Sequence, residues 1–432
     1  MTPETAELGS LSAVTRIIPR RALPIAVERL SYGRGLIVNG PRQCGKSELL
    51  RMLHDQLGGT LSSLDEPVQL RAARTDPTGF VSDRALPLFV DEVQRGGNPL
   101  VLALKVLLDG SREPGQVVLA GSTRFLTEPR LSESLAGRVR FLDLWPLAQA
   151  EIEEASEANP VDLLLSSTRR LRRAYAALPG PSRREVYERV CRGGYPEAVL
   201  APSDRARIGF FNDYVRTISQ RDITEIGRIA QRVELPGFMR VLASRTATVL
   251  NTATLADVVG LTPDSVRRYL PLVETVFLTM RLPAWSRNVT AQLRRRPKVH
   301  LTDSGLAAAL TGTTPDRMLD PASTYTGQLL ETFVVTELVK LTTWCEEPVA
   351  LSHYRDAEGR EADVVLESPD GRITAIEVKA AVDVDERDVR HLTYLRDQLG
   401  ESFTNGVIIH CGKQTVPLGD RITALPVNAL WS

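Results

Sequence analysis

The chain has 432 residues, 43% of them hydrophobic and 25% charged, which is the composition of a globular protein. At about 150 residues per domain, this length predicts two or three domains rather than a single core. The 53 basic and 53 acidic residues cancel, which excludes a generally basic nucleic-acid binder and leaves such binding to local clusters.

Membrane and redox signals are weak in this sequence. No uninterrupted apolar run approaches the ~20 residues that a membrane-spanning helix needs, and residues 1–21 lack the pattern of a signal peptide. The four cysteines, Cys44, Cys191, Cys345 and Cys411, form no C-x-x-C pair and have no histidine at zinc-finger spacing. We therefore expect a cytoplasmic protein with reduced thiols, no structural zinc and no membrane partner.

Short apolar runs alternate with amphipathic segments over residues 30–151, which favours a parallel sheet wound with helices. Strands are predicted at 35–39, 59–63, 88–90, 116–120 and 140–144, and helices at 47–56 and 100–109. The first predicted domain is therefore an α/β unit over residues 20–150.

Residues 40–47, GPRQCGKS, fit the G-x-x-x-x-G-K-[ST] pattern of a phosphate-binding (Walker A) loop between a strand and a helix. Glycines let backbone N–H groups curl around phosphates, Lys46 reaches the β- and γ-phosphates, and the Ser47 hydroxyl ligates Mg²⁺. The motif predicts ATP and Mg²⁺ as cofactors. The candidate nucleotide-binding residues are Gly40, Pro41, Arg42, Gln43, Cys44, Gly45, Lys46, Ser47 and Glu48.

A buried strand ending in two carboxylates supplies the second half of the predicted site, at Leu88-Phe89-Val90-Asp91-Glu92. Asp91 is expected to hold the Mg²⁺ shell, and Glu92 to orient and deprotonate the attacking water. A glutamate in this second position is typical of hydrolysis rather than nucleotide sensing. We therefore predict an ATPase in which Lys46 and Glu92 have catalytic roles.

The strand predicted at 116–120 runs into small polar residues. Ser122 or Thr123 would lie beside the γ-phosphate as a sensor. Arg124 or Arg138 would stabilise transition-state charge, within the subunit or from a neighbour, although a plain surface or sheet-edge charge is an equal alternative for each. Cys44 also has two interpretations: a redox-sensitive thiol in the loop or, preferred, a small tolerated side chain.

Residues 151–320 have a helical pattern with arginine-rich faces. Two short helices within 252–285 are joined at Gly260-Leu261-Thr262, where Thr262 suits an N-cap and Pro263 the first helical position. A β-like stretch follows, so we predict a winged helix-turn-helix at about 235–300. The basic clusters, at 169–173, at 287–298 and at Arg189 with Arg192, are either nucleic-acid contacts or, preferred for each alone, solvated faces and turns.

From about residue 325 the pattern returns to α/β. A helix is predicted at 327–342, strands at 352–355, 361–367, 374–379 and 406–410, and a second helix at 385–398. We predict a second, separate α/β domain over residues 321–432. The polar stretch at 153–182 is predicted to be a linker or a mobile helical excursion.

Several motifs occur together along residues 20–412: GPRQCGKS (40–47), VDEVQ (90–94), LAGSTRFL (119–126), SLAGR (134–138), GGYPE (193–197), RDI (221–223), READVVLE (360–367) and AIEVKAA (375–381). In this order they resemble prokaryotic ATPases of the AAA superfamily that carry a restriction-endonuclease-like C-terminal domain of unknown function. The resemblance implies an α/β chain with a P-loop NTPase parallel sheet, a helical and winged-helix middle, and a restriction-endonuclease-like α/β end. Cys44 departs from the Val or Ala typical of such loops.

The two C-terminal motifs look like the D…E-x-K core of the PD-(D/E)XK nuclease fold, formed by Asp363, Glu377 and Lys379. In that interpretation Asp363 and Glu377 bind a divalent metal, with Glu331 on the preceding helix as a third carboxylate candidate. Lys379 would orient the nucleophile or stabilise negative charge, and strand alternation places it on one face with Glu377. Metal-dependent cleavage and a nuclease-like fold without activity both remain open.

The leading expectation is Mg²⁺-dependent ATP binding and hydrolysis coupled to binding or processing of nucleic acid, with DNA preferred over RNA. The alternative is an ATP-controlled signalling or defence switch whose nuclease-like domain is inactive and binds a protein partner. A transcriptional regulator is disfavoured because VRRYL (266–270) offers few polar side chains for reading base edges. Assembly into a homo-oligomer is expected as well, since AAA relatives often place active sites between subunits.

Overall fold

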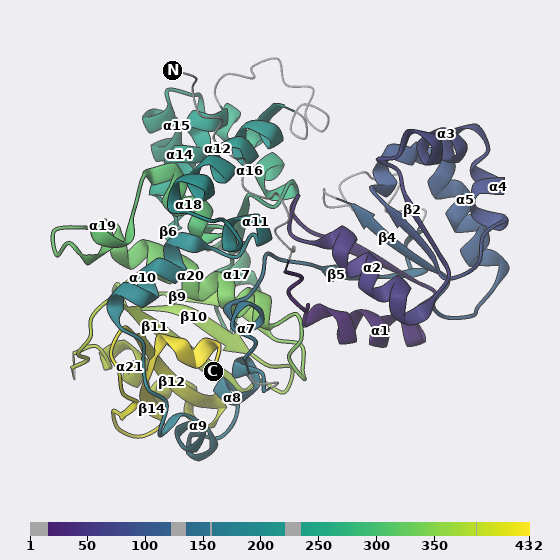
Figure 1. The fold of residues 1–432 in the computed structure, drawn as a ribbon. Coiled ribbons are helices and arrows are strands. Elements are labelled where there is room, and N and C mark those ends of the chain that lie inside the picture. The colour runs from purple at the N-terminus through teal and green to yellow at the C-terminus, as the bar shows by residue number, and fades with distance from the viewer. Residues whose placement is uncertain (1–15, 122–134, 156–157, 221–234, 386) are drawn as a thin grey trace, which may run out of the picture.

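A computed structural model describes residues 16–121, 135–155, 158–220, 235–385 and 387–432. Figure 1 shows a first sheet with its helices to one side, and a helical region and a second sheet on the other. No helix within these ranges combines the length and the hydropathy of a membrane span. The α/β class predicted from the sequence, with a parallel sheet, a helical middle and a C-terminal sheet, is confirmed.

The first sheet is parallel, and its described strands have the order β2-β3-β4-β1-β5. The strands are β1 (Gly35–Asn39), β2 (Thr60–Ser63), β3 (Leu88–Asp91), β4 (Val117–Gly121) and β5 (Val139–Asp143). The helices are α1 (Ala22–Tyr32), α2 (Lys46–Leu57), α3 (Pro67–Thr75), α4 (Pro77–Ser82) and α5 (Gly97–Gly110), with the 3-10 helix η1 (Val93–Gly96). Each strand lies within one residue of its predicted position, because short apolar runs mark strands buried on both faces.

Helices cover both faces of this sheet. Leu36 and Val38 of β1 pack in one cluster with α1 and α2, while Ile37 packs in another with α3, α4 and α5. Successive strand residues point to opposite faces, which explains this division. The layering leaves the carboxyl ends of β1, β3 and β4 at one edge, where the predicted phosphate loop begins.

The middle of the chain is mainly helical. Its helices are α7 (Gln149–Ile152), α8 (Pro160–Leu164), α9 (Thr168–Tyr175), α10 (Arg183–Arg192), α11 (Pro196–Val199), α12 (Asp204–Gln220), α14 (Leu235–Ser244), α15 (Thr252–Val259), α16 (Pro263–Thr275), α17 (Val289–Arg294), α18 (Ser304–Thr311) and α19 (Pro315–Leu319). An antiparallel sheet of the order β6-β8-β7 lies among them, with β6 (Thr248–Val249), β7 (Thr279–Leu282) and β8 (Lys298–Leu301).

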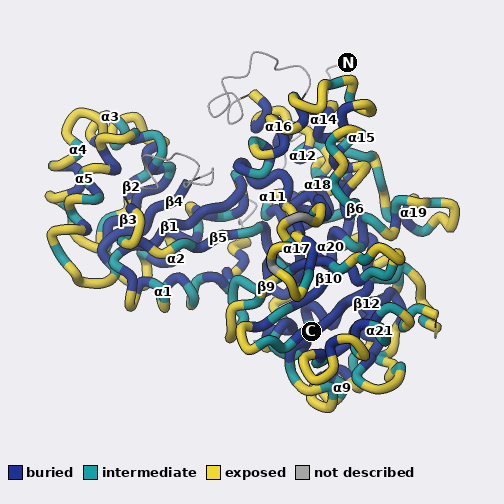
Figure 2. The backbone as a smooth tube through the Cα atoms, turned by 180° about the vertical axis from the view of Figure 1, so that it is seen from behind, coloured by how far each residue is buried: buried dark blue, intermediate teal, exposed yellow. Residues whose placement is uncertain are grey.

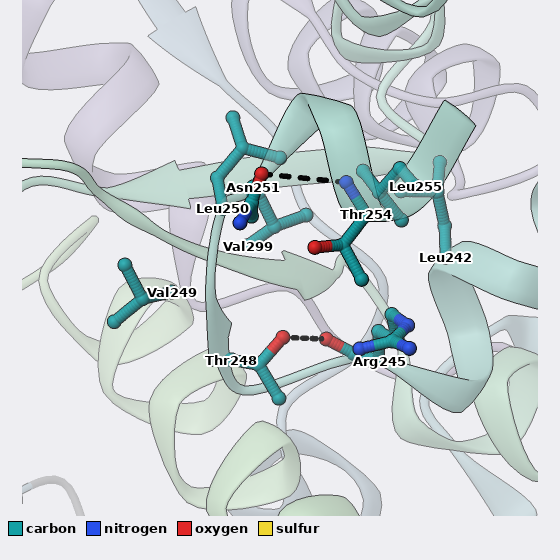
Figure 3. Close-up of a pocket in the computed structure, with 9 residues that line it drawn as sticks. All are labelled: Leu242, Arg245, Thr248, Val249, Leu250, Asn251, Thr254, Leu255 and Val299. Atoms are coloured by element: carbon teal, nitrogen blue, oxygen red, sulfur yellow. Dashed lines mark hydrogen bonds between the residues drawn. The ribbon is translucent and has the colours of Figure 1, made fainter. Parts of the chain in front are cut away.

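The predicted helix pair is present as α15 and α16. Gly260 ends α15 in the left-handed conformation, Thr262 accepts a hydrogen bond from Ser265 N, and Pro263 begins α16. Figure 3 shows how Asn251 caps α15 through the amide of Thr254, beside a cavity of about 240 Å³ between α14, β6 and α15. These elements give the middle a compact helix-turn-helix framed by short strands.

The second sheet is mixed and has the order β13-β14-β12-β11-β10-β9. Its strands are β9 (Ala350–Arg355), β10 (Glu361–Glu367), β11 (Ile373–Lys379), β12 (Phe403–His410), β13 (Val416–Pro417) and β14 (Ile422–Pro426). Its helices are α20 (Thr326–Leu341) and α21 (Arg390–Leu399), with the 3-10 helices η3 (Gly400–Ser402) and η4 (Val427–Leu430). The four predicted strands lie within three residues of β9 to β12, whereas β13 and β14 were not predicted.

The C-terminal sheet shares a hydrophobic core with the middle of the chain. A single cluster of buried residues runs from the helices between α8 and α18 through α20 into the second sheet. Figure 2 shows α20 and the neighbouring strands as one buried region. Residues 153–182 are not a free linker, because Asn405 of β12 donates to Leu164 O at 2.9 Å and Tyr175 donates to Ala429 O at 2.9 Å.

One of the basic clusters has a structural role within this contact. Arg172, in the RRLRR run, donates to the Thr423 hydroxyl and to the carbonyls of Gly419 and Ile422. Its guanidinium therefore holds α9 against β14. For this arginine, the structural alternative explains the sequence better than a nucleic-acid contact.

Candidate functional site

The loop between β1 and α2 has the backbone that phosphate binding requires. Gly45 has a φ of +101° and Gln43 a φ of +58°, so the chain turns through left-handed conformations before α2 begins. A Cβ on Gly40 would lie 2.2 Å from Leu144 O, so the passing chain leaves room for glycine alone. Gly45, the N-cap residue of α2, has no side chain with which to cap the helix, and this suits the N-terminus of α2 to an anion.

Lys46 and Ser47 stand at the start of α2. The buried ammonium of Lys46 donates to Gly40 O at 2.9 Å and Pro41 O at 2.7 Å, folded over its own loop. The Ser47 hydroxyl donates to a carboxylate oxygen of Asp91 at 2.5 Å, which brings the loop and the end of β3 together. The two predicted magnesium ligands therefore lie within one hydrogen bond of each other.

Glu92 follows Asp91 directly and adopts a left-handed backbone, with a φ of +53°. Such a conformation is costly for a residue other than glycine, and strained residues of this kind cluster at functional sites. Its carboxylate accepts a hydrogen bond from Gln94. Burial raises the pKa of Glu92, although the ammonium of Lys46 acts in the opposite direction.

These groups suit Mg²⁺ and a nucleoside triphosphate. Uncapped amides and Lys46 would hold the phosphates, while Ser47 and Asp91 offer the oxygen ligands that Mg²⁺ prefers. Among the remaining candidates, Pro41 and Cys44 are buried in the loop and Arg42 is half-buried. Glu48 is different, because its carboxylate pairs with Arg51 at 2.8 Å on the surface of α2.

Among the candidate sensors and arginines, Arg138 is the one within the described residues. Ser122, Thr123 and Arg124 lie outside the described residues. Arg138 directly precedes β5, whose first residue Val139 pairs with Gly35, so it lies at the sheet edge opposite the loop. There it forms a two-fold ion pair with Asp109, with distances of 2.6 and 3.0 Å. The register of β5 therefore does not support the within-subunit role predicted for Arg138, while a role toward a neighbouring subunit and a plain sheet-edge charge both remain.

Cys44 is part of the packing rather than an open thiol. It is fully buried, and its sulfur donates to Leu144 O at 3.3 Å. Burial raises the pKa of the thiol, against the opposing charges of Lys46 and Arg20. Because the thiolate is the reactive form, these properties favour the small packed side chain over the redox sensor.

A buried arginine that the sequence analysis missed braces the loop. Arg20 donates to Cys44 O at 2.6 Å, to Trp145 O at 2.7 Å and to a carboxylate oxygen of Glu151 at 3.1 Å. The side chains of Arg20 and Glu151 are only 5% and 1% exposed. A buried ion pair therefore fixes one carbonyl of the phosphate loop.

Two of the carboxylates predicted in the C-terminal half, those of Glu331 and Asp363, lie close together and contact one lysine, Lys298. The ammonium of Lys298, on β8, lies 2.7 Å from Glu331 on α20 and 2.9 Å from Asp363 on β10. The second oxygen of Asp363 accepts from Val378 N at 2.9 Å. Although burial alone would lower the pKa of Lys298, the two carboxylates raise it, which keeps the ammonium charged.

Glu377 and Lys379 lie on one face of β11, as strand alternation predicted. Their side chains pair at 3.1 Å, and Lys379 also lies 3.7 Å from Asp388. The other oxygen of Glu377 is buried without a hydrogen-bond partner among the described residues. Burial and the nearby Asp363 raise the pKa of Glu377 to about 8, so this carboxyl holds a proton at neutral pH.

The C-terminal group does not fit a divalent metal as it stands. Within the described ranges, no three His, Cys, Asp or Glu side chains are arranged to hold a metal ion. The Lys298 ammonium occupies the position between Glu331 and Asp363 that a cation would take. The predicted metal role of Glu331, Asp363 and Glu377 is therefore not supported by this arrangement.

Three buried residues that the sequence analysis did not single out share one signal. Lys298 interrupts the apolar strand KVHL, and Glu337 and Lys340 interrupt the apolar face of α20. Charged residues inside apolar elements are seldom fully buried unless they are paired. That pattern marks them as members of buried ion pairs, but the partners are distant in the sequence.

Comparison with protein families supports the P-loop assignment of the N-terminal α/β unit. Residues 33–153 match the family described as AAA domain, and residues 183–317 and 326–430 match two families described as domains of unknown function, DUF8612 and DUF4143. Together with the parallel sheet and the phosphate loop, the first match shows that residues 33–153 form a P-loop ATPase fold. The two other matches assign no activity.

Two relatives, the uncharacterized proteins Rv2008c of Mycobacterium tuberculosis and Mb2031c of Mycobacterium bovis, are each 25% identical over 395 residues. Each match covers 91% of this chain and 80% of the relative.

Among solved structures, the Walker-type ATPase PABY2304 of Pyrococcus abyssi matches with 14% identity and a TM-score of 0.41, over 70% of this chain and 99% of that one. The RuvB Holliday junction branch migration motor of Thermotoga maritima matches with 18% identity and a TM-score of 0.28, over 61% and 86%. Both similarities are too distant to bear on function.

Proposed function

We propose that the protein binds ATP with Mg²⁺ at residues 40–48 and hydrolyses it. The observation that carries this proposal is the 2.5 Å contact between Ser47 and Asp91, which joins the phosphate loop to the carboxylate strand. This contact supports the proposal because it brings two oxygen groups of the kind that Mg²⁺ prefers close to the N-terminus of α2, where backbone amides favour anions.

Each residue has a defined role in this proposal. Lys46 leaves the carbonyls of Gly40 and Pro41 and contacts the β- and γ-phosphates. Ser47 and Asp91 hold Mg²⁺, which neutralises phosphate charge. Glu92 orients the attacking water and accepts its proton, and its half-buried position and raised pKa suit a general base. Ser122 and Thr123 remain candidates for sensing the γ-phosphate.

ATP hydrolysis by the purified full-length protein tests this proposal. We expect release of phosphate from ATP that depends on Mg²⁺ and is lost in Lys46→Ala. Titration of a fluorescent ATP analogue separates binding from hydrolysis. A folded wild-type protein that neither binds nor hydrolyses ATP would contradict the proposal.

We also propose that hydrolysis is coupled to nucleic acid, preferably DNA, through a winged helix at about 235–300. Arg267 and Arg268 are exposed near the start of α16, where Arg267 pairs with Asp264, three residues earlier. This exposed position suits contacts with phosphates. Stimulation of ATP hydrolysis by duplex DNA, weakening as salt rises, is the expected result. An ATPase rate unaffected by DNA or RNA would contradict this coupling.

A second candidate is favoured by Lys298. Because its ammonium lies between Glu331 and Asp363, the C-terminal half fits a binding module controlled by ATP better than a metal-dependent nuclease. In this reading the restriction-endonuclease-like domain, residues 321–432, recognises a protein partner without cutting. Cleavage of single-stranded, duplex or branched DNA with Mg²⁺ or Mn²⁺, lost in Lys379→Ala, would exclude the second candidate.

We also propose that the chain has three domains, at residues 20–150, 151–320 and 321–432. Assembly into a homo-oligomer is part of the same proposal. Arg138 lies at the sheet edge opposite the phosphate loop. From there it would reach the active site of a neighbouring subunit. Sedimentation with and without ATP tests assembly. Arg138→Ala should lower the ATPase rate only under conditions in which the protein assembles.

A further inference from the structure

A short segment, residues 147–152, lies between the phosphate loop and α20. It follows β5, and buried polar side chains contact it both from the side of the loop and from the side of α20. We call it the link. Figure 1 shows that the chain passes here from the first sheet into the rest of the molecule.

On the loop side, the link is held by Arg20 and Glu151. Arg20 contacts the loop through Cys44 O and the link through Glu151. The other oxygen of Glu151 accepts from Ala148 N at 2.9 Å, so the carboxylate also fixes the backbone of the link. One guanidinium and one carboxylate thus connect the loop and the link rigidly.

On the opposite side, the link is held by Glu337 and Lys340 of α20. Gln149 N donates to Glu337 at 2.7 Å, and Lys340 donates to Leu147 O at 3.1 Å. Glu337 and Lys340 pair at 2.7 Å, with side chains 0% and 5% exposed. The contacts are shielded from water, so they are strong and leave little freedom to rearrange separately.

The GGYPE motif, residues 193–197, also contacts the link. Leu147 N donates to Gly194 O at 2.7 Å, and Gly194 N donates to Asp303 at 2.7 Å. A Cβ on Gly194 would lie 2.2 Å from Leu147 O and 3.0 Å from the Lys340 ammonium. Close packing around the link therefore requires glycine at position 194, which gives the GGYPE motif a structural role beside the link.

We propose that Arg20 is a positioning residue for the phosphate loop, and that the Arg20–Glu151 and Glu337–Lys340 pairs transmit the nucleotide state of the loop through the link to α20. This inference rests on the proposed ATP binding. Lys46 exchanges its two loop carbonyls for phosphates when ATP binds, and Cys44 O is the loop atom that Arg20 holds. A change in the loop is thus passed to Glu151 and then to the backbone of the link.

The proposed transmission ends at Lys298 and the two carboxylates that it contacts, those of Glu331 and Asp363. Glu331 is on the same helix as Glu337, six residues earlier, which corresponds to about 9 Å along an α-helix. A shift of α20 therefore changes the contact between Glu331 and Lys298 as well. ATP binding would alter the C-terminal half without any direct contact between the two sites.

Hydrogen exchange of backbone amides tests the proposal on the full-length protein. A non-hydrolysable ATP analogue with Mg²⁺ is expected to slow exchange at α2, at residues 144–152 and at α20 in the wild type. The double variant Glu337→Gln with Lys340→Met removes both charges at similar volume, so that neither charge is left alone. In this variant we expect the slowing at α2 to remain and that at α20 to be lost.

Affinity measurements separate the two ends of the link. Arg20→Gln should weaken binding of the analogue about tenfold, because a buried hydrogen bond from a charged donor is lost. The double variant should bind it within about twofold of the wild type. Asp385→Asn with Arg387→Met, an exposed pair 2.7 Å apart that precedes α21, is the matched control and should behave as the wild type in both assays.

The outcomes distinguish this inference from the proposed function. Slowing at α2 without any slowing at α20 in the wild type overturns transmission, and so does equal slowing at α20 in the double variant. Unchanged affinity in Arg20→Gln overturns the positioning role. Failure of the wild type to bind the analogue contradicts the proposed ATP site itself.

Discussion

The ammonium of Lys298 lies 2.7 Å from a carboxylate oxygen of Glu331 in the interior of the C-terminal half. Asp363 lies on its other side at 2.9 Å. Lys298 is only 6% exposed, so two buried carboxylates share this internal positive charge. A divalent cation would have to displace the lysine in order to reach the same oxygens.

Lys298→Met should therefore destabilise the protein and create a cation site. Removing one partner from a buried pair leaves uncompensated charge, which costs ~3–5 kcal/mol. Thermal unfolding at pH 7 should show a lower Tm that Mn²⁺ restores, whereas the wild type without nucleotide should show no effect of Mn²⁺. Lys379→Met, a partly exposed lysine on β11, is the control. A wild type stabilised by Mn²⁺ as strongly as the variant would contradict the role of Lys298.

Glu377→Gln should stabilise the protein at alkaline pH. The pKa of Glu377 is raised from its ordinary 4.5 to about 8, so the folded protein holds a proton that the unfolded chain releases. The stability from this group is fully present below about pH 4.5 and is lost as the pH rises through about 8. Tm values of variant and wild type should converge near pH 4.5, separate progressively between pH 4.5 and about 8, and stay apart above that, with the variant higher.

Glu401→Gln, an exposed carboxylate in η3, serves as the control for this comparison. A difference in Tm between Glu377→Gln and the wild type that stays constant from pH 4.5 to 9 would show that Glu377 does not titrate in this range.

Glu92→Gln should bind ATP normally and hydrolyse it slowly. A positioned general base contributes about 10²- to 10⁴-fold in rate, so kcat should fall by that factor while the affinity stays within about threefold. Burial raises the pKa of Glu92, and the base must be deprotonated. Wild-type kcat should therefore fall with acidification at a higher pH than an exposed glutamate would cause.

The matched control is Glu113→Gln, an exposed carboxylate that precedes β4 at the opposite edge of the sheet. Its kcat and pH profile should equal those of the wild type. If Glu92→Gln hydrolysed ATP at the wild-type rate, another residue would have to be the base.

Cys44 should resist alkylation in the folded protein. Its thiol is fully buried and its pKa is raised by burial, so little thiolate is available to react. Treatment with iodoacetamide at pH 7.5, followed by mass spectrometry, should leave Cys44 unmodified and ATP hydrolysis unchanged. Denaturation before treatment should expose it. Loss of ATP binding in proportion to labelling of Cys44 would restore the redox interpretation.

The sequence predicted the first sheet closely because its signals are local. Apolar runs mark β1, β3 and β4, and the glycines and Lys46 of the loop are contiguous in the chain. Asp91 and Glu92 follow a buried strand, so their position at the same sheet edge follows from parallel topology. The contact between Ser47 and Asp91 needed no information beyond that order.

Other features depend on contacts between distant segments. Arg20 and Glu151 are 131 residues apart, and Lys298 and Asp363 are 65 apart, so no local pattern pairs them. Arg138 was assigned to the active site from its motif, but the register of β5 places it at the opposite edge. The short strand β14, ITALP, was missed because five residues ending in proline resemble a turn.

Equilibrium binding of ATP to the full-length protein, with Mg²⁺ and beside Lys46→Ala, tests the central claim most directly. We predict saturable binding by the wild type and at least a tenfold weaker affinity in the variant, because a charged contact with the phosphates is lost. Equal affinities, or no binding by a folded wild type, would contradict the claim that residues 40–48 form an ATP site.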